Sequence, residues 1–414
     1  MNMIGKTRAA EDAYAMPGLQ ENFATEVDLA SRWLGGSVLA ASDESFGEKE
    51  SLLTPTPSAF VPGNYGPRGE IVDGWETKRR REPGHDWALI RLGAAGIITA
   101  VDVDTSFFTG NFPTTCRIEA CGVEGYPGPK ALQSGDTEWI EIVPRSPLKG
   151  DTHNRFEVSD RRRFTHIRLS AFPDGGIARL RVFGHVVADP RLFDHLSIDL
   201  ASQDHGGQVV TSSDGFYTSA AMLNRPDKGR NMGDGWETRR RRDDGNDHAL
   251  FRLALPGTLR LVEIDTAHFK YNASAEIALH GAAGEAMPGA DSDAWQPLLS
   301  RRPLQPDTRH VFPLPAGASA ISFVRLDAFP DGGISRVRLW GTVDPAARRE
   351  AGYRWFNALP AGQAAHVLLE LGASAGLAEQ LTVARPLAGE TIGSLDGDAA
   401  VLAALRATLN GDAA

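Results

Sequence analysis

Short segments in which apolar and polar residues alternate recur through the first 345 residues of the chain. Residues 87–92 (WALIRL), 97–104 (IITAVDVD) and 115–121 (TCRIEAC) are examples, and such segments predict β-strands. Gly93 follows the first of them and is expected to end it. Gly- and Pro-rich turns between the segments favour an antiparallel sandwich or jelly roll. After about Pro345 the pattern changes to Ala- and Leu-rich stretches with helical spacing, which predict a tail of two or three short helices.

The polar motifs between these strands occur twice. Residues 73–81 read DGWETKRRR and residues 234–242 read DGWETRRRR, an offset of 161. The sequence AFPDGGI occupies residues 171–177 and again residues 328–334. Repetition at this spacing predicts two tandem copies of one β-domain. We assign an N-terminal arm to residues 1–20, the first repeat to 21–190, the second repeat to 191–345 and a helical C-terminal extension to 346–414.

Charge and composition narrow the classes of partner. The chain has 53 acidic and 43 basic residues, a net charge of −10, which argues against a nucleic-acid binder because phosphate contact needs a basic field. No stretch is long and apolar enough for a membrane span, and the N-terminus lacks the apolar core of a signal peptide. Cys116 and Cys121 are expected to be reduced thiols. We therefore expect a cytoplasmic protein that binds neither nucleic acid nor membrane.

Each duplicated motif has a structural and a chemical interpretation. Asp-Gly at the start of the first motif is a turn signal, and Trp75 after it is expected to be buried. The arginine run is either a solvated charged segment or a site for a small anion, because guanidinium groups bind carboxylates through two hydrogen bonds. Pro-Asp-Gly-Gly is strong turn chemistry, and turn geometry alone could explain why it is repeated.

Carboxylates and amides stand at matching positions of the two copies, whereas no histidine of one copy matches a histidine of the other. Asp104 and Asp265 end apolar strands, where either a capped strand end or a site in a rim loop is expected. HExxH, GxSxG and Walker A patterns are absent, so chemistry shared by the copies must come from carboxylates. The catalytic candidates are Glu76, Asp104, Glu237 and Asp265. The candidates for substrate binding are Asp73, Arg79, Arg80, Arg81, Asn111, Asp174, Asp234, Arg240, Arg241, Arg242, Asn272 and Asp331.

The chain resembles the allantoicase (allantoate amidinohydrolase) family over about residues 29–341. The resemblance is carried by the duplicated DGWET and AFPDGG motifs, the segment DVDTSFF at 102–108 and Asn111. The resemblance implies two galactose-binding-like (discoidin-like) jelly rolls, a homo-oligomer, and hydrolysis of allantoate to ureidoglycolate and urea in allantoin and purine degradation. It also implies that arginines hold the substrate carboxylate, that Asn and Asp bind its ureido groups, and that carboxylates such as Glu76 and Asp104 share the acid and base roles.

Several alternatives stay open from the sequence. The chain could be a non-catalytic tandem jelly-roll module that binds a ligand, since fold alone does not imply function, or an enzyme acting on a neighbouring ureide such as ureidoglycolate. Both copies could be active, or one site could be built between them. No ligand spacing demands a metal, although the acidic residues could bind a divalent cation such as Mn²⁺. Residues 355–386 of the tail weakly resemble the first helices of the OHCU decarboxylases.

Overall fold

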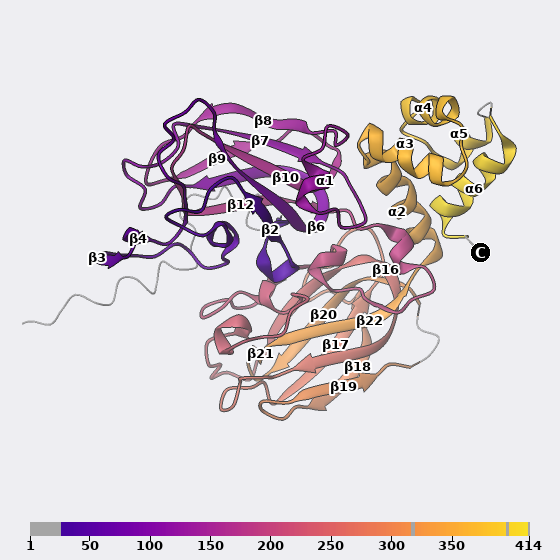
Figure 1. Cartoon of the computed structure of the whole chain (residues 1–414). Coiled ribbons are helices and arrows are strands. Elements are labelled where there is room, and N and C mark those ends of the chain that lie inside the picture. The colour runs from indigo at the N-terminus through magenta and orange to yellow at the C-terminus, as the bar shows by residue number, and fades with distance from the viewer. Residues whose placement is uncertain (1–25, 316–318, 395–396, 413–414) are drawn as a thin grey trace, which may run out of the picture. The chain divides into compact units, whose positions relative to one another are not determined.

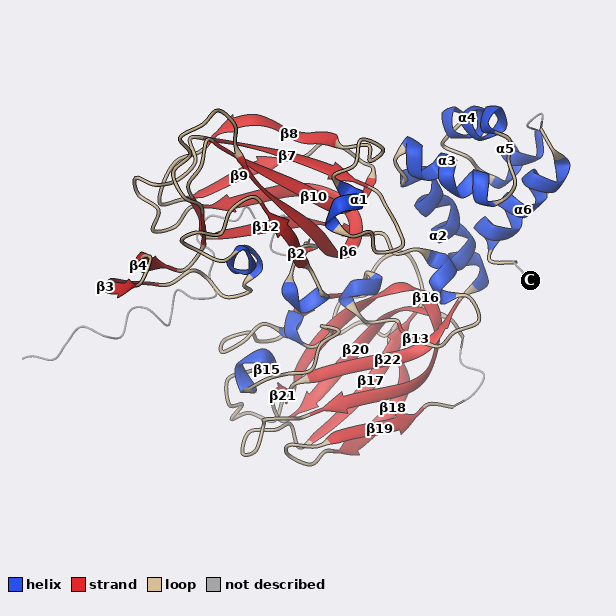
Figure 2. Cartoon of the chain, viewed as in Figure 1, coloured by secondary structure: helices blue, strands red, loops and turns tan. Residues whose placement is uncertain are grey.

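The computed structural model describes residues 26–315, 319–394 and 397–412, so the arm expected at residues 1–20 lies outside the described residues. The chain divides into two compact units, one made mainly of residues up to 185 and the other mainly of residues from 186 onward. Strands dominate both units, and helices gather in the C-terminal segment (Figures 1 and 2). The expected fold class, all-β with two tandem sandwiches and a helical extension, is confirmed.

The first unit is built on one set of eight hydrogen-bonded strands. A hairpin and a short strand pair lie outside this set, and both form part of the candidate site described below. The eight strands are β1 (Val27–Asp28), β2 (Ser37–Ala41), β6 (Asp86–Asp104), β7 (Thr115–Cys121), β8 (Ile140–Pro147), β9 (His153–Glu157), β10 (Arg163–Phe172) and β12 (Arg179–Val186); the hairpin is β3 (Phe60–Gly66) with β4 (Gly69–Val72), and the short pair is β5 (Trp75–Glu76) with β11 (Gly176–Ile177).

The strands predicted at 87–92 and 97–104 are one continuous strand, β6, so the expectation that Gly93 ends the first of them is wrong. Gly93 serves close packing: its backbone N–H donates to the carbonyl of Leu29 at 2.7 Å, and a Cβ at this position would lie 2.7 Å from the backbone nitrogen of Gly36. The N-terminal part of β6 pairs with β2 and its C-terminal part pairs with β9. One long strand therefore takes part in both layers of the sandwich.

The second unit repeats this plan around the equally long strand β16, whose N-terminal part pairs with β14 and β20 and whose C-terminal part pairs with β19 and β22. The register with β20 shifts between Arg252 and Gly257, where Pro256 interrupts the ladder, as expected at a bend. The strands are β13 (Ile198–Asp199), β14 (Gln208–Ser212), β15 (Trp236–Glu237), β16 (Asp247–Asp265), β17 (Glu276–Ala282), β18 (Gln296–Pro303), β19 (Arg309–Pro313), β20 (Ile321–Phe329), β21 (Gly333–Ile334) and β22 (Arg336–Val343).

The core between the layers comes from the alternating apolar positions. In β16, Ala249, Phe251 and Leu253 are buried in one cluster that also takes Val324 and Leu326 from β20. Burial of each large apolar side chain contributes roughly 1.5–3 kcal/mol. Every second residue of the strand therefore contacts the core, which is the same alternation of apolar and polar residues that predicted the strands.

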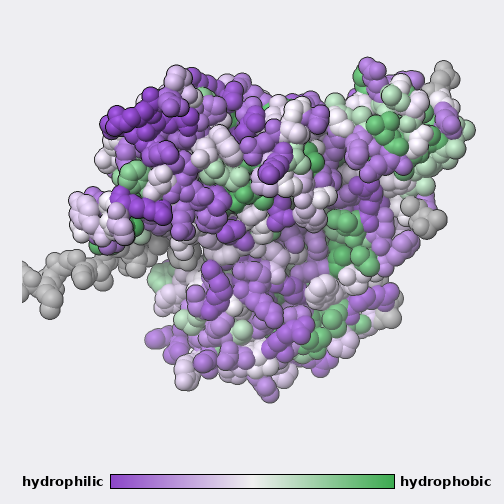
Figure 3. All heavy atoms as spheres, in the orientation of Figure 1, coloured by the Kyte–Doolittle hydropathy of each residue, from purple (hydrophilic) through white to green (hydrophobic). Residues whose placement is uncertain are grey.

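The C-terminal extension forms its own apolar core around Trp355 and Phe356. Its first helix begins where Asp344 accepts hydrogen bonds from the backbone nitrogens of residues 346 and 347, an N-cap. On the face shown in Figure 3, apolar residues lie on this extension among hydrophilic ones. None of the described helices is long and apolar enough to cross a membrane. In the described part of this extension there are five helices instead of two or three: α2 (Pro345–Ala358), α3 (Ala361–Glu370), α4 (Ala375–Val383), α5 (Gly389–Ser394) and α6 (Ala399–Asn410).

Candidate functional site

The DGWET motif forms a short strand whose tryptophan is a core residue. Trp75 is fully buried, as predicted, and its indole N–H donates to the carbonyl of Asp43 at 2.9 Å. In the second repeat, Trp236 makes the same bond to the carbonyl of Asp214 at 2.8 Å. Because side chains alternate along a strand, the residue after the tryptophan points away from that core. That residue is Glu76 in the first repeat.

The AFPDGG turn packs directly on the DGWET segment, so the two motifs form one unit. The Asp174 carboxylate accepts a hydrogen bond from the backbone N–H of Arg80 at 2.9 Å, and Asp331 does the same for Arg241 at 3.0 Å. The strands β11 and β5 also pair, with Gly176 opposite Glu76. Asp174 and Asp331 therefore act through backbone contacts that join the motifs.

The same turn also positions the Asn111 loop. The backbone N–H of Gly176 donates to the carbonyl of Asn111 at 2.7 Å. Gly175 has a φ of 134°, and a Cβ there would lie 2.5 Å from that carbonyl oxygen. Both the backbone conformation and the close approach therefore require glycine at position 175, beside this loop.

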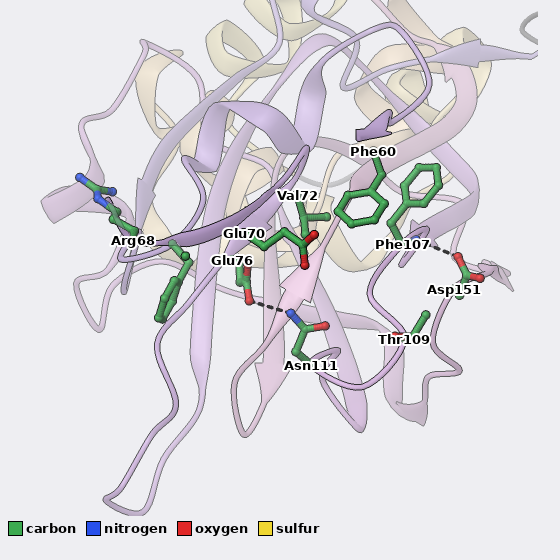
Figure 4. Close-up of a pocket in the computed structure, with 11 residues that line it drawn as sticks. Phe60, Arg68, Glu70, Val72, Glu76, Phe107, Thr109, Asn111 and Asp151 are labelled. Carbon is green, nitrogen blue, oxygen red and sulfur yellow. Dashed lines mark hydrogen bonds between the residues drawn. The ribbon is translucent and has the colours of Figure 1, made fainter. Parts of the chain in front are cut away.

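Glu76 and Asn111 meet at the centre of this arrangement. The amide Nδ2 of Asn111 donates to Oε1 of Glu76 at 2.7 Å (Figure 4). Burial raises the pKa of the Glu76 carboxyl above its usual value, and the hydrogen bond from Asn111 opposes that increase. A carboxylate with a raised pKa that is held by one neighbour is suited to proton transfer. In the second repeat, Asn272 donates to Glu237 at the same distance, 2.7 Å.

A pocket of about 460 Å³ opens beside the Glu76–Asn111 pair, a volume within the usual range for small-molecule sites. The β3–β4 hairpin, the loop between β6 and β7 and the loop before β9 form most of its wall. Carboxylates outnumber cations among the lining residues, which are Phe46, Phe60, Arg68, Gly69, Glu70, Val72, Glu76, Phe107, Thr109, Asn111 and Asp151.

The arginine run lies outside the lining of this pocket. Nη1 of Arg80 binds Oδ1 of Asp86 at 2.8 Å, and the Asp86 side chain is almost fully buried. Arg241 makes the equivalent ion pair with buried Asp247 at 2.6 Å. The middle arginine of each run thus neutralises a buried carboxylate. The outer arginines of both runs are exposed, namely Arg79, Arg81, Arg240 and Arg242.

The carboxylates at the strand ends hold the turns that follow them. Asp104 is buried, and its Oδ1 accepts hydrogen bonds from the backbone N–H and the hydroxyl of Ser106 at 2.8 and 2.6 Å. Asp265 accepts the corresponding backbone bond from Ala267 at 2.8 Å. Neither lines the pocket, so the geometry matches the capped strand end that was one of the two interpretations.

The first aspartate of each DGWET motif is held in an ion pair. Asp73 contacts Arg179 at 2.6 Å, and Asp234 contacts Arg230 at 2.9 Å. Neither lines the pocket. Of the first-repeat candidates, the structure thus brings Glu76 and Asn111 together at the pocket.

Comparison with known proteins decides the family. Residues 27–187 and 198–344 each match the family model described as "Allantoicase repeat". The chain belongs to the allantoicase family. It is 49% identical over 317 residues to the "Probable allantoicase" of Nocardia farcinica, covering 76% of this chain and 94% of that relative. The "Probable allantoicase" of Streptomyces coelicolor is 46% identical over 342 residues, covering 80% and 89%.

Among solved structures, the crystal structure of allantoicase from Saccharomyces cerevisiae is similar, with a TM-score of 0.65 and 34% identity over 76% of this chain and 93% of that chain. The match to the allantoicase repeat ends at residue 344, and α2 begins at the next residue. The helical extension is therefore an addition to the part of the chain that defines the family.

Sequence reasoning about this allantoicase-family chain missed several residues of the site and its support. Asp86 and Asp247 keep the offset of 161 that the DGWET motifs share, so the repeat comparison could have found these buried partners of the arginines. Arg68, Glu70 and Asp151 line the pocket without belonging to a duplicated motif. Two of these three lie on the hairpin connection or its second strand, a segment that reads as a Gly- and Pro-rich loop.

No group of three or more His, Cys, Asp or Glu side chains that could hold a metal ion is present among the described residues. Cys116 and Cys121 are free and buried, and burial raises the pKa of each thiol to about 12. Both are therefore protonated at neutral pH and unsuited to nucleophilic attack.

Proposed function

We propose that this allantoicase-family chain hydrolyses allantoate to ureidoglycolate and urea, in allantoin and purine degradation, and that it does so in the pocket beside Glu76 and Asn111. Membership of the family supports the reaction. The observation that supports this site is the 2.7 Å hydrogen bond between Asn111 and a half-buried carboxylate of raised pKa at the wall of the pocket.

The pocket suits the chemical groups of allantoate, which carries one carboxylate and two ureido groups on a single carbon. Ureido N–H groups are donors and pair with the carboxylates of Glu70 and Glu76. The Asn111 amide donates to a ureido carbonyl. Arg68 is the one cation among the lining residues. Its Nη1 donates to the carbonyl of Glu44 at 3.2 Å, and its guanidinium extends away from Glu76 and Asn111 (Figure 4), so we assign it to the substrate carboxylate after rotation into the pocket. The exposed Arg79 and Arg81 are the second candidates for that role.

Hydrolysis needs a proton to move from water to the departing nitrogen. The bond between the central carbon and one ureido nitrogen breaks, the water oxygen bonds to that carbon, and the leaving nitrogen gains a proton to give urea. Glu76 can accept the proton from water and pass it to that nitrogen, a contribution of roughly 10²–10⁴-fold. Asn111 keeps the carboxylate oriented while this happens.

The test is the product formed by the purified full chain. Incubation with allantoate, with and without added Mn²⁺, is expected to release one urea and one ureidoglycolate per substrate. Urea from ureidoglycolate but not from allantoate would favour the neighbouring-ureide alternative. Tight binding of allantoate with no urea under any of these conditions would favour a non-catalytic binding module.

Assembly and location are further proposals. The family resemblance implies a homo-oligomer, which light scattering on the purified chain would test directly. The two free, buried cysteines are in keeping with a reducing, cytoplasmic setting. Fractionation of the source cells would test that location.

A further inference from the structure

The two repeats share the Glu–Asn pair but differ in what covers it. Residues 44–72 of the first repeat contain the β3–β4 hairpin, which supplies the pocket wall. The corresponding stretch of the second repeat, residues 215–233, is shorter. It forms the 3₁₀-helix at Ala220–Met222 and begins another at Met232–Asp234. The second pair therefore has a different neighbour.

That neighbour is Met232. Nδ2 of Asn272 donates both to Oε1 of Glu237 at 2.7 Å and to Sδ of Met232 at 3.2 Å. A thioether is a weak acceptor on an apolar side chain. Both N–H bonds of this amide are thus directed at groups of the chain itself, and Asn272 is half-buried whereas Asn111 is exposed.

A second difference between the repeats, Phe107 in the first and His268 in the second, fixes the position of the shorter segment. Phe107 and His268 are equivalent: their φ values are 69° and 73°, and their backbone N–H groups donate to Asp151 and Asp307 at 2.8 and 2.7 Å. The Phe107 ring packs against Phe60 of the hairpin, with centroids 5.7 Å apart, and lines the pocket. His268 instead binds a backbone carbonyl through Nε2 at 2.9 Å, that of residue 229.

We infer that catalysis is confined to the first repeat, and that the Glu237–Asn272 pair of the second repeat is a structural element that holds residues 229–234 in place. Each chain then has one substrate site. This inference rests on the proposed function. The hairpin is the feature that separates the active repeat from the inactive one, because it provides a pocket wall where the second repeat has the shorter segment that contacts Asn272.

The experiment compares matched variants of the full chain, Glu76→Gln against Glu237→Gln. Urea release from allantoate is expected to fall by roughly 10²–10⁴-fold in the first variant and to stay within about two-fold of the unchanged chain in the second, because Glu237 meets no substrate. Met232→Leu keeps an apolar cover and is also expected to stay within two-fold. Calorimetric titration with allantoate is expected to give one equivalent bound per chain.

The outcomes separate the two proposals. If the unchanged chain releases no urea, the proposed function fails, and the binding stoichiometry alone then tests the number of sites. A loss of clearly more than two-fold in either Glu237→Gln or Met232→Leu, or two equivalents of allantoate bound per chain, would overturn the inference. Activity that halves in each glutamate variant would overturn it as well, since that result requires two independent sites.

Discussion

The Arg80–Asp86 ion pair allows a quantitative test of what the arginine run does. Replacing Arg80 by Ala leaves the Asp86 carboxylate buried, with the Ser42 hydroxyl at 2.9 Å among its remaining partners. Breaking a buried pair on one side costs roughly 3–5 kcal/mol, and we take the lower end because the Arg80 side chain is 30% exposed. For a unit of this size, ~3 kcal/mol lowers the melting temperature by roughly 6–12 °C.

The assay is thermal unfolding followed by circular dichroism, with Arg79→Ala as the matched control. Arg79 is the exposed neighbour in the same run, so its removal is expected to change the free energy of unfolding by about 0.5 kcal/mol or less. If Arg80→Ala melts within a degree or two of Arg79→Ala, the structural role assigned to Arg80 is wrong. The same comparison with Arg241→Ala tests the equivalent pair with Asp247.

Three further predictions concern the pocket. Gly175→Ala is expected to lower urea release at least ten-fold, because its Cβ would meet the Asn111 carbonyl, whereas Gly110→Ala, which meets open space, is expected to be neutral. Because the ionised Glu76 carboxylate is the acting form, activity is expected above its raised pKa and is lost as the pH falls through that pKa. Asn111→Ala removes a hydrogen bond that lowers this pKa, so the acidic limb of the pH–rate profile is expected to move to higher pH. Arg68→Gln is expected to raise KM for allantoate with little change in kcat, and an unchanged KM would exclude Arg68 as the carboxylate partner.

The alternating pattern predicted the strands well because core contacts in a sandwich follow the same period of two. It failed at Gly93, which reads as a stop signal, because the residues that pack against this glycine come from a distant loop. The hairpin at residues 60–72 also escaped prediction. Its glycines and proline are typical of a loop. Its apolar side chains, such as Val61 and Tyr65, are exposed, so no buried apolar face identifies it as a pair of strands.

The repeat comparison selected candidate residues but did not distinguish the ways in which they act. It selected Glu76 and Asn111, which lie 35 residues apart and meet only because the PDGG turn joins their loops. It also selected residues such as Asp174, whose identity reflects backbone geometry rather than contact with a ligand. A residue can be identical in the two copies because it contacts a ligand or because it fixes the backbone geometry. Only the three-dimensional contacts distinguish these two reasons.

The most direct test of the central claim, that the carboxylate beside Asn111 performs the hydrolysis, is the kcat for urea release by Glu76→Gln at saturating allantoate. Glutamine keeps the size of the side chain and can still bond to Asn111, but it cannot accept the proton of the attacking water. The account predicts a kcat lower by roughly 10²–10⁴-fold, with the melting temperature and the affinity for allantoate retained. A kcat within two-fold of the unchanged chain would contradict it.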